Sequence, residues 1–231
     1  MTSLVSAPQR TLTERQLERR RRILAAAQSL VAREGYDAVT MRAIAGASGT
    51  AEKTLYNIFG TKDRLVALAA NARSEMVFET ASDTVVVPGW ERLRAFCREA
   101  TTATLDEPLL SRAMALLLLD HAELVGLQQL YAERVGADVA AMIAGGLLGD
   151  KVPPGDVVRA IRLGVVSSVV FWAKGEVADA EFEAWLVRQC LQALLPHATE
   201  AGMRHFVAEF SQFPLRPQTA QAVLTEFPSN L

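Results

Sequence analysis

Apolar residues recur at every third or fourth position along most of the chain, which places them on one face of an α-helix. The first such stretch begins near Thr13 and ends at Gly35. Its predicted buried stripe consists of Ile23, Leu24, Ala27, Leu30 and Val31. Only residues 84–87 have the β-branched composition of a strand, and this short run precedes Pro88. The pattern therefore predicts an all-α protein.

Two short helices are predicted directly after the first one. The earlier helix spans about 41–47, with Thr40 as its N-cap and Ile44 as its apolar anchor. Gly49 breaks the chain, and the later helix spans about 51–59. A pair of short helices joined by a tight turn that contains glycine is the sequence form of a helix-turn-helix.

Longer helices fill the rest of the chain. Thr61 is expected to cap a helix that runs to about Ala81 and buries Leu65, Leu68, Ala69 and Met76. Further helices are predicted at 89–105, 107–122, 123–148, 155–174 and 179–195, and 199–213 could add one more. The tail from Pro214 is left unassigned.

Charge divides the chain into a basic head and an acidic body. Residues 1–64 contain eleven Lys/Arg and six Asp/Glu, whereas the remainder contains thirteen and twenty. The head alone is therefore expected to meet a polyanion. The longest apolar stretches are too short to span a bilayer, and the N-terminus lacks the pattern of a secretory signal. Cys97 and Cys190 form no C-x-x-C pair, so we expect no disulfide framework and a cytoplasmic location.

The second short helix has two different faces. Lys53, Thr54 and Asn57 lie together at helical spacing, while Leu55 and Phe59 lie on the opposite side, with Ile58 as an alternative to Phe59 in the core. In a helix-turn-helix, the polar face of this second helix enters the DNA major groove.

The residues in and around this unit resemble the TetR family of regulators. The resemblance covers about residues 18–68 and is carried by the stretches Thr40-Met41-Arg42-Ala43-Ile44-Ala45, Thr54-Leu55-Tyr56-Asn57-Ile58-Phe59 and Thr61-Lys62-Asp63-Arg64-Leu65. It implies a helix-turn-helix DNA-binding domain at 1–64 and a helical bundle at 65–231 that binds an effector and dimerises. It also implies a repressor that a small molecule releases from its operator.

The resemblance assigns roles within the motif. Thr40, Arg42, Thr54, Tyr56 and Lys62 are expected near DNA phosphates, and Glu52, Lys53 and Asn57 near base edges. Thr50 and Ala51, at the start of the second short helix, are also expected at the DNA. The family usually has a Ser-like cap where this chain has Ala51, so Thr50 is an alternative cap. The run 19–22, four arginines, is either an exposed helical face or a further DNA contact.

A homodimer is expected because one helix-turn-helix reads about half of a typical operator. Segments 156–174 and 179–195 are apolar on more than one side, which a partner copy would explain. The residues predicted at this interface are Val158, Ile161, Val165, Val169, Trp172, Phe182, Trp185, Leu186 and Cys190. The alternative is a helix pair that is fully buried within one chain.

An effector pocket is expected between the middle helices of the body, as in the family. Candidate lining residues are Trp90, Phe96, Met114, Leu117, Leu118, His121, Gln128, Tyr131, Met142 and Phe171. Because charges are scarce among them, the effector is predicted to be largely apolar.

Two other functions stay open. One is a DNA-binding regulator that has no small-molecule effector. The other is a helical enzyme, for which Asp120, His121 and Glu123 form the only cluster that hints at acid–base chemistry. No zinc-binding histidine pair, phosphate-binding glycine loop or nucleophile elbow accompanies that cluster, so we expect no catalysis, cofactor or metal.

Overall fold

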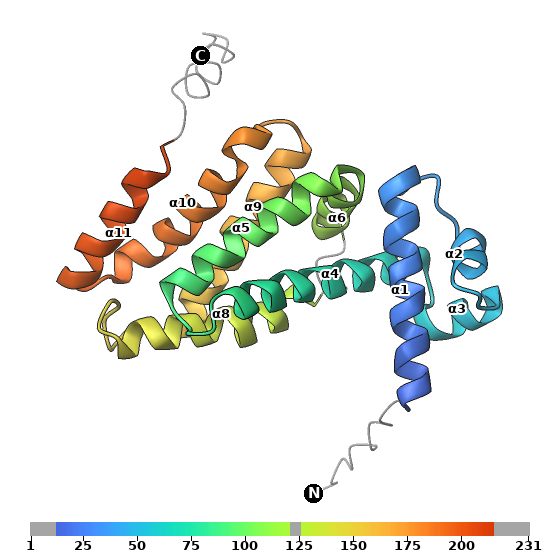
Figure 1. The fold of residues 1–231 in the computed structure, drawn as a ribbon, viewed down its shortest axis with the longest axis horizontal. Helices are drawn as coiled ribbons and strands as arrows, with labels where there is room; N and C mark the ends of the chain where they lie inside the picture. The colour runs from blue at the N-terminus through green and yellow to red at the C-terminus, as the bar shows by residue number, and fades with distance from the viewer. Residues whose placement is uncertain (1–12, 121–125, 215–231) are drawn as a thin grey trace, which may run out of the picture.

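The computed structural model describes residues 13–120 and 126–214 (Figure 1). Within these ranges the regular elements are helices, and the only β-type pairing is an isolated bridge between Leu148 and Ala198. The N-terminal unit consists of α1 (Glu14–Glu34), α2 (Met41–Ala47) and α3 (Glu52–Phe59). The prediction of an all-α fold is confirmed.

The body contains the longer helices. These are α4 (Lys62–Thr84), α5 (Trp90–Asp106), α6 (Pro108–Asp120), α8 (Leu127–Ala144), α9 (Pro154–Ala173), α10 (Phe182–Leu194) and α11 (Glu200–Gln212). Short 3₁₀ turns, Asp179–Glu181 and Leu195–His197, flank α10. Figure 1 shows α4 running from the N-terminal unit across the body, with α11 at the far end. None of the helices in the described ranges is both long and apolar enough to cross a membrane.

The N-terminal unit has a hydrophobic core of its own. Ile23 and Val31 of α1 meet Ile44 of α2 and Leu55 and Phe59 of α3, all almost fully buried. Leu65, Val66 and Ala69 of α4 complete this core together with Leu110 and Ala113 of α6. A boundary at 64–65 therefore falls inside α4, whose first turns pack with the head.

A second core fills the body, and aromatic rings form part of it. Phe78 of α4 stacks on Phe96 of α5 at 4.1 Å between ring centroids, and Tyr131 of α8 meets both rings edge-on. Cys97 and Cys190 lie beside this group with their Sγ atoms 3.7 Å apart, as free buried thiols. Their mutual hydrogen bond and burial raise the pKa of the Cys97 thiol, which keeps it protonated and unreactive.

Helix ends and inward faces differ from the sequence prediction in three places. Helix α4 continues to Thr84, so the strand-like run at 84–87 starts as helix. Met76, expected inside, is 61% exposed. The segment expected to be helical at 123–148 ends at Ala144, where two consecutive glycines, Gly145 and Gly146, close the helix.

Helix α11 approaches the start of the α8–α9 connection very closely. A Cβ placed on Gly202 would lie 1.9 Å from the backbone oxygen of Leu147. Thr199, the N-cap of α11, also donates its hydroxyl to the Gly146 carbonyl at 2.7 Å. Only glycine fits at position 202, so α11 docks through its backbone.

We predict that Gly202→Ala lowers the free energy of unfolding by about 1–3 kcal/mol, because the added methyl group displaces backbone. Thermal unfolding of the full chain measures this. Gly136→Ala in α8 is the matched control, since its Cβ meets nothing within 4 Å. The control should be stabilising by about 0.5–1 kcal/mol. Equal melting temperatures for the two variants would contradict the described docking.

Candidate nucleic-acid interface and effector cavity

The two short helices begin in different ways. The Thr40 hydroxyl accepts a hydrogen bond from the Ala43 amide at 3.1 Å, so α2 is capped as predicted. Helix α3 begins at Glu52 with Ala51 at its N-cap and no side-chain cap. Thr50 is not the alternative cap, because its hydroxyl donates to the Ser48 carbonyl at 3.4 Å. Gly49, at φ +59°, makes the turn between the helices.

Helix α3 has one anchored face and one free face. Leu55 and Phe59 are fully buried, whereas Ile58 is only partly buried. On the outer side Glu52, Lys53 and Asn57 are exposed, Tyr56 is 50% exposed and Thr54 is half-buried. Of the two aromatic residues, Phe59 is therefore a core residue and Tyr56 presents its ring and hydroxyl to solvent.

Two arginines of α1 hold the motif in place. The Arg22 Nε donates to the Ser48 carbonyl at 2.9 Å, across the turn that precedes α3. The Arg20 guanidinium lies 5.0 Å from the centre of the Phe59 ring. Arg21 instead lies on the exposed side, 3.7 Å from Glu18. Some arginines of the run 19–22 thus pack against the motif, and others lie on the exposed surface. The sequence did not show which arginine does which.

Lys62 fixes the start of α4 to the loop after α1. Its Nζ donates to the Tyr36 carbonyl at 3.1 Å and lies 4.1 Å from the centre of the Tyr36 ring. The Tyr36 hydroxyl donates to Asp63, and burial together with this carboxylate raises the pKa of the phenol. An ammonium has three donors, so this contact leaves Lys62 able to meet a phosphate.

The body contains a small apolar cavity of about 90 Å³ between α4, α5, α6, α8 and α9. Its apolar walls come from Val77, Phe96, Ala100, Ala103, Met114, Leu127, Tyr131, Val165, Val166 and Val169. Ser74, Thr104 and Ser111 add hydroxyls, and Arg73 adds a guanidinium. Burial raises the pKa of Tyr131, which stays neutral in this wall.

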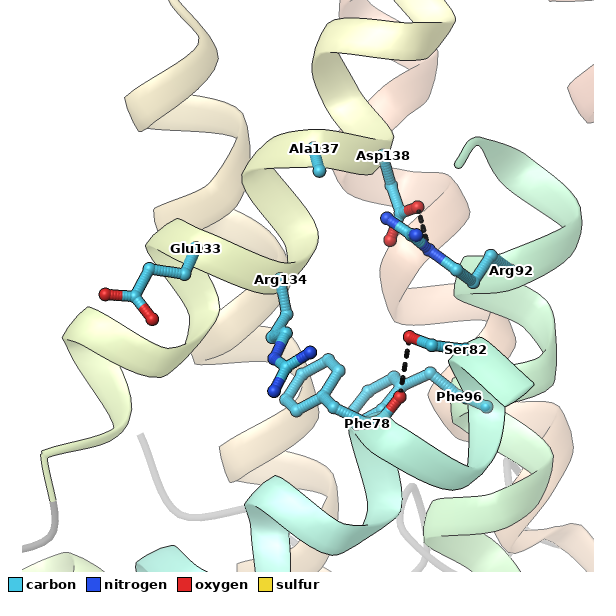
Figure 2. A pocket seen from close by; sticks show the side chains of 9 residues that line it. Phe78, Ser82, Arg92, Phe96, Glu133, Arg134, Ala137 and Asp138 are labelled. Carbon is cyan, nitrogen blue, oxygen red and sulfur yellow. Dashed lines mark hydrogen bonds and ion pairs between the residues drawn. The ribbon is translucent and has the colours of Figure 1, made fainter. Parts of the chain in front are cut away.

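A second pocket of about 150 Å³ opens between α4, α5 and α8, on the other side of Phe96. Figure 2 shows Arg92 and Asp138 meeting at one end and Arg134 beside Phe78 at the other. The Arg92 Nε donates to Asp138 at 2.7 Å, and the Gly89 amide donates to the same oxygen at 3.0 Å. Burial raises the pKa of Asp138 although both partners oppose it. Across the described ranges, no three His, Cys, Asp or Glu side chains gather as a metal site requires.

Comparison with known proteins identifies the N-terminal unit. A family model described as bacterial regulatory proteins, tetR family, matches residues 23–69. Residues 23–69 therefore match the N-terminal domain of the TetR family. Two similar proteins are the HTH-type transcriptional repressors KstR of Rhodococcus jostii and Mycobacterium tuberculosis. The first is 35% identical over 99 residues, 43% of this chain and 47% of that protein. The second is 35% identical over 105 residues, which are 44% of this chain and 47% of that protein. The alignments thus span about half the length of these relatives.

Solved TetR-family structures share the fold over most of the chain. A TetR regulator from Rhodococcus sp. RHA1 has a TM-score of 0.61 at 20% identity and covers 79% of this chain and 98% of its own. Thermus thermophilus FadR, a TetR-family repressor solved with lauroyl-CoA, has a TM-score of 0.60 at 21% identity. The match covers 78% of this chain and 97% of the FadR chain. At these identities the likeness concerns the fold alone.

The residues predicted to line an effector pocket lie in different parts of the body. Phe96, Met114 and Tyr131 line the apolar cavity. Trp90 packs on Phe206 in the core instead, and Met142 is likewise buried there. Gln128 is exposed and Phe171 is 45% exposed. His121 lies outside the described residues, as does Glu123, and for Leu117, Leu118 and Asp120 only the backbone of α6 is described. The sequence did not identify Arg73 as a lining residue, because it resembles a surface charge, nor the valines of α9, because their spacing is that of ordinary core.

The residues predicted at the dimer interface are mostly used within the chain. The buried ones are Val158, Ile161, Val165, Trp172, Phe182, Leu186 and Cys190. Val169, which lines the apolar cavity, and Trp185 are partly buried. These seven side chains are thus buried within the single chain, in the core that α9 and α10 share with neighbouring helices. The outer face of α9 instead carries Leu163 and Phe171, at 55% and 45% exposure.

We predict that Ala51→Ser stabilises the chain by about 0.5–2 kcal/mol, because a hydroxyl at the N-cap can accept an amide hydrogen of the first turn of α3. Thermal unfolding without DNA measures this. Thr40→Ala is the matched reverse change, since it removes the existing cap of α2 and should destabilise by a similar amount. If Ala51→Ser lowers the melting temperature, α3 does not begin where the structure places it.

Proposed function

We propose that this protein is a sequence-specific DNA-binding transcriptional repressor whose α3 enters the major groove. One observation carries the proposal: α3 is anchored by Leu55 and Phe59 while Lys53, Tyr56 and Asn57 face solvent. An exposed helix with polar side chains on a basic head is suited to a groove lined by phosphates. The KstR relatives, described as transcriptional repressors, support the same function.

The proposed contacts divide into two groups. Thr40, Arg42, Thr54, Tyr56 and Lys62 meet phosphates and set the register, together with backbone amides at Thr50 and Ala51. Glu52, Lys53 and Asn57 face base edges, where an Asn can pair with adenine and a Lys with guanine. Glu52 is acidic, so it opposes binding except where it accepts a hydrogen bond from a cytosine amine.

We predict that Arg42→Ala weakens binding to every duplex alike and lowers the slope of log affinity against log salt by about 0.9, one lost phosphate contact. Fluorescence anisotropy with the DNA upstream of the protein's own gene measures both. Arg98→Ala, an equal charge change on an exposed residue of α5, should leave both unchanged. In the same titration, Asn57→Ala should alter the preference among operator variants. Absence of salt-sensitive binding by the unaltered chain would overturn the proposed function.

The repressor is proposed to act as a homodimer, because two half-sites lie about one helical turn of DNA, ~34–36 Å, apart. Leu163 and Phe171 lie eight residues apart on the outer face of α9, which is the same side of the helix. An outward apolar stripe on a long helix suits a self-complementary contact with the same helix of a second copy. This proposed stripe differs from the interface that the sequence predicted.

We predict that Phe171→Glu converts the dimer to monomers, because it places a charge in the apolar contact. Light scattering after gel filtration gives the mass. Val207→Glu is the matched control, since Val207 is an exposed apolar residue, 49% exposed, on α11. Dissociation by the control and not by Phe171→Glu would place the interface on α11.

The effector is proposed to occupy the apolar cavity, which adjoins both α4 and α9. Helix α4 carries the head and α9 carries the proposed dimer stripe, so a change in the cavity alters the spacing of the two heads. Coupling of this kind is typically ~1–3 kcal/mol, enough for a several-fold to hundredfold loss of DNA affinity. The alternative, a regulator with no effector, predicts that no small molecule raises the melting temperature.

A further inference from the structure

Arg73 differs in charge from the other residues that line the apolar cavity. Among the described residues that line it, Arg73 alone carries a charge. Its guanidinium donates to the Glu107 carboxylate through Nη1 and to the Ala103 carbonyl through Nη2. The Arg73 side chain is 17% exposed and that of Glu107 is 42% exposed. The cation is therefore held in the wall of the cavity, whereas its anion lies at the surface and can move into water.

These contacts join α4 to the corner between α5 and α6. Ala103 lies in the last turn of α5, and Glu107 is the residue immediately before α6. Helix α6 in turn contributes Leu110 and Ala113 to the core of the head. The Arg112 guanidinium of α6 lies 5.3 Å from the Trp172 ring of α9. The Arg73–Glu107 pair thus sits where the head, the cavity and the proposed dimer helix meet.

We propose that the effector is an apolar molecule with a single carboxylate, which takes the place of Glu107 on Arg73. This inference rests on the proposed function, because it names the ligand class of the same cavity. A carboxylate matches the guanidinium as Glu107 does, with two parallel hydrogen bonds available. The exchange leaves the Arg73 charge paired, and Glu107 moves into solvent. The favourable free energy then comes from burying the hydrocarbon part against the valines of α9.

The same geometry rejects other head groups. An alcohol cannot compensate the Arg73 charge, so it cannot displace Glu107 without leaving a partly buried cation unpaired. An amine would place a second cation beside Arg73. Arg73 therefore selects ligands whose polar group is negatively charged, and the rest of the cavity selects only for apolar character.

The small size of the cavity explains how ligand binding there would affect the DNA-binding head. Its volume of about 90 Å³ is smaller than the ~150 Å³ of an apolar cavity that holds one benzene. A chain of several methylene groups must therefore push the walls apart. Met114 of α6 is the most adaptable part of the wall and packs against both cores. Loss of the Glu107 contact and displacement of Met114 both act on α6, which adjoins the head.

The test compares three probes of equal chain length: octanoate, 1-octanol and octylamine. Thermal unfolding of the full chain reports binding, and anisotropy with operator DNA reports release. Octanoate should raise the melting temperature and weaken DNA binding, with half-effect at a concentration at least tenfold below that of the other two. If octanoate stabilises the chain and no DNA binds, the proposed function fails while the ligand class stands.

Substitutions at Arg73 and Glu107 test whether the carboxylate of the ligand binds Arg73. Arg73→Met should remove the preference for octanoate over 1-octanol, and Arg73→Lys, which keeps the charge for a better chance of folding, should reduce it. Glu107→Gln should tighten octanoate binding several-fold, because the competing anion is gone. Arg134→Met, in the neighbouring pocket, is the matched control and should keep the preference. The inference is overturned if octanoate and 1-octanol act alike on the unaltered chain. It is equally overturned if Glu107→Gln leaves octanoate binding unchanged, or if Arg134→Met alone removes the preference.

Discussion

One helix belongs to two cores, and the rest of the structure depends on this. The first turns of α4 bury Leu65, Val66 and Ala69 in the head, and its later turns bury Phe78 and Ala81 in the body. Because interiors are close-packed, a shift of α4 in the body must be felt in the head. Helix α6 adds a second connection, through Leu110 and Ala113. Head and body therefore cannot move independently.

The head itself is built to hold α3 firmly while leaving its outer face free. Arg22 fixes the turn before α3, Arg20 covers the Phe59 ring and Lys62 ties the start of α4 to Tyr36. Each of these cations contributes its charge to the basic head and at the same time orients the motif. A short helix with no side-chain cap needs such support, because eight residues are too few for a helix to be stable alone.

The sequence was sufficient for the local structure of the head. Thr40, Gly49 and Gly60 mark the ends of α2 and α3, and the apolar spacing identifies Leu55 as buried. These features depend on neighbours within a few residues, which a pattern records. The position of the α3 cap was less certain, since only the structure shows the Thr50 hydroxyl turned toward Ser48.

The body was harder to predict because periodicity identifies an apolar face and not the element that covers it. Val165 and Leu186 were expected to meet a partner copy, yet neighbouring helices of the same chain bury them. Cys97 and Cys190 are 93 positions apart, and no local pattern places their sulfurs together. Arg73 and Glu107 likewise resemble ordinary surface charges until α4 and the α5–α6 corner are packed against each other.

The outer face of α3 is proposed to lie in a DNA groove. Hydrogen–deuterium exchange of the full chain, with and without operator duplex, can show whether it does. We expect slower exchange in α2, α3 and the first turn of α4 when DNA is added, and little change in α11. Protection confined to the body, with unchanged exchange in α2 and α3, would contradict it.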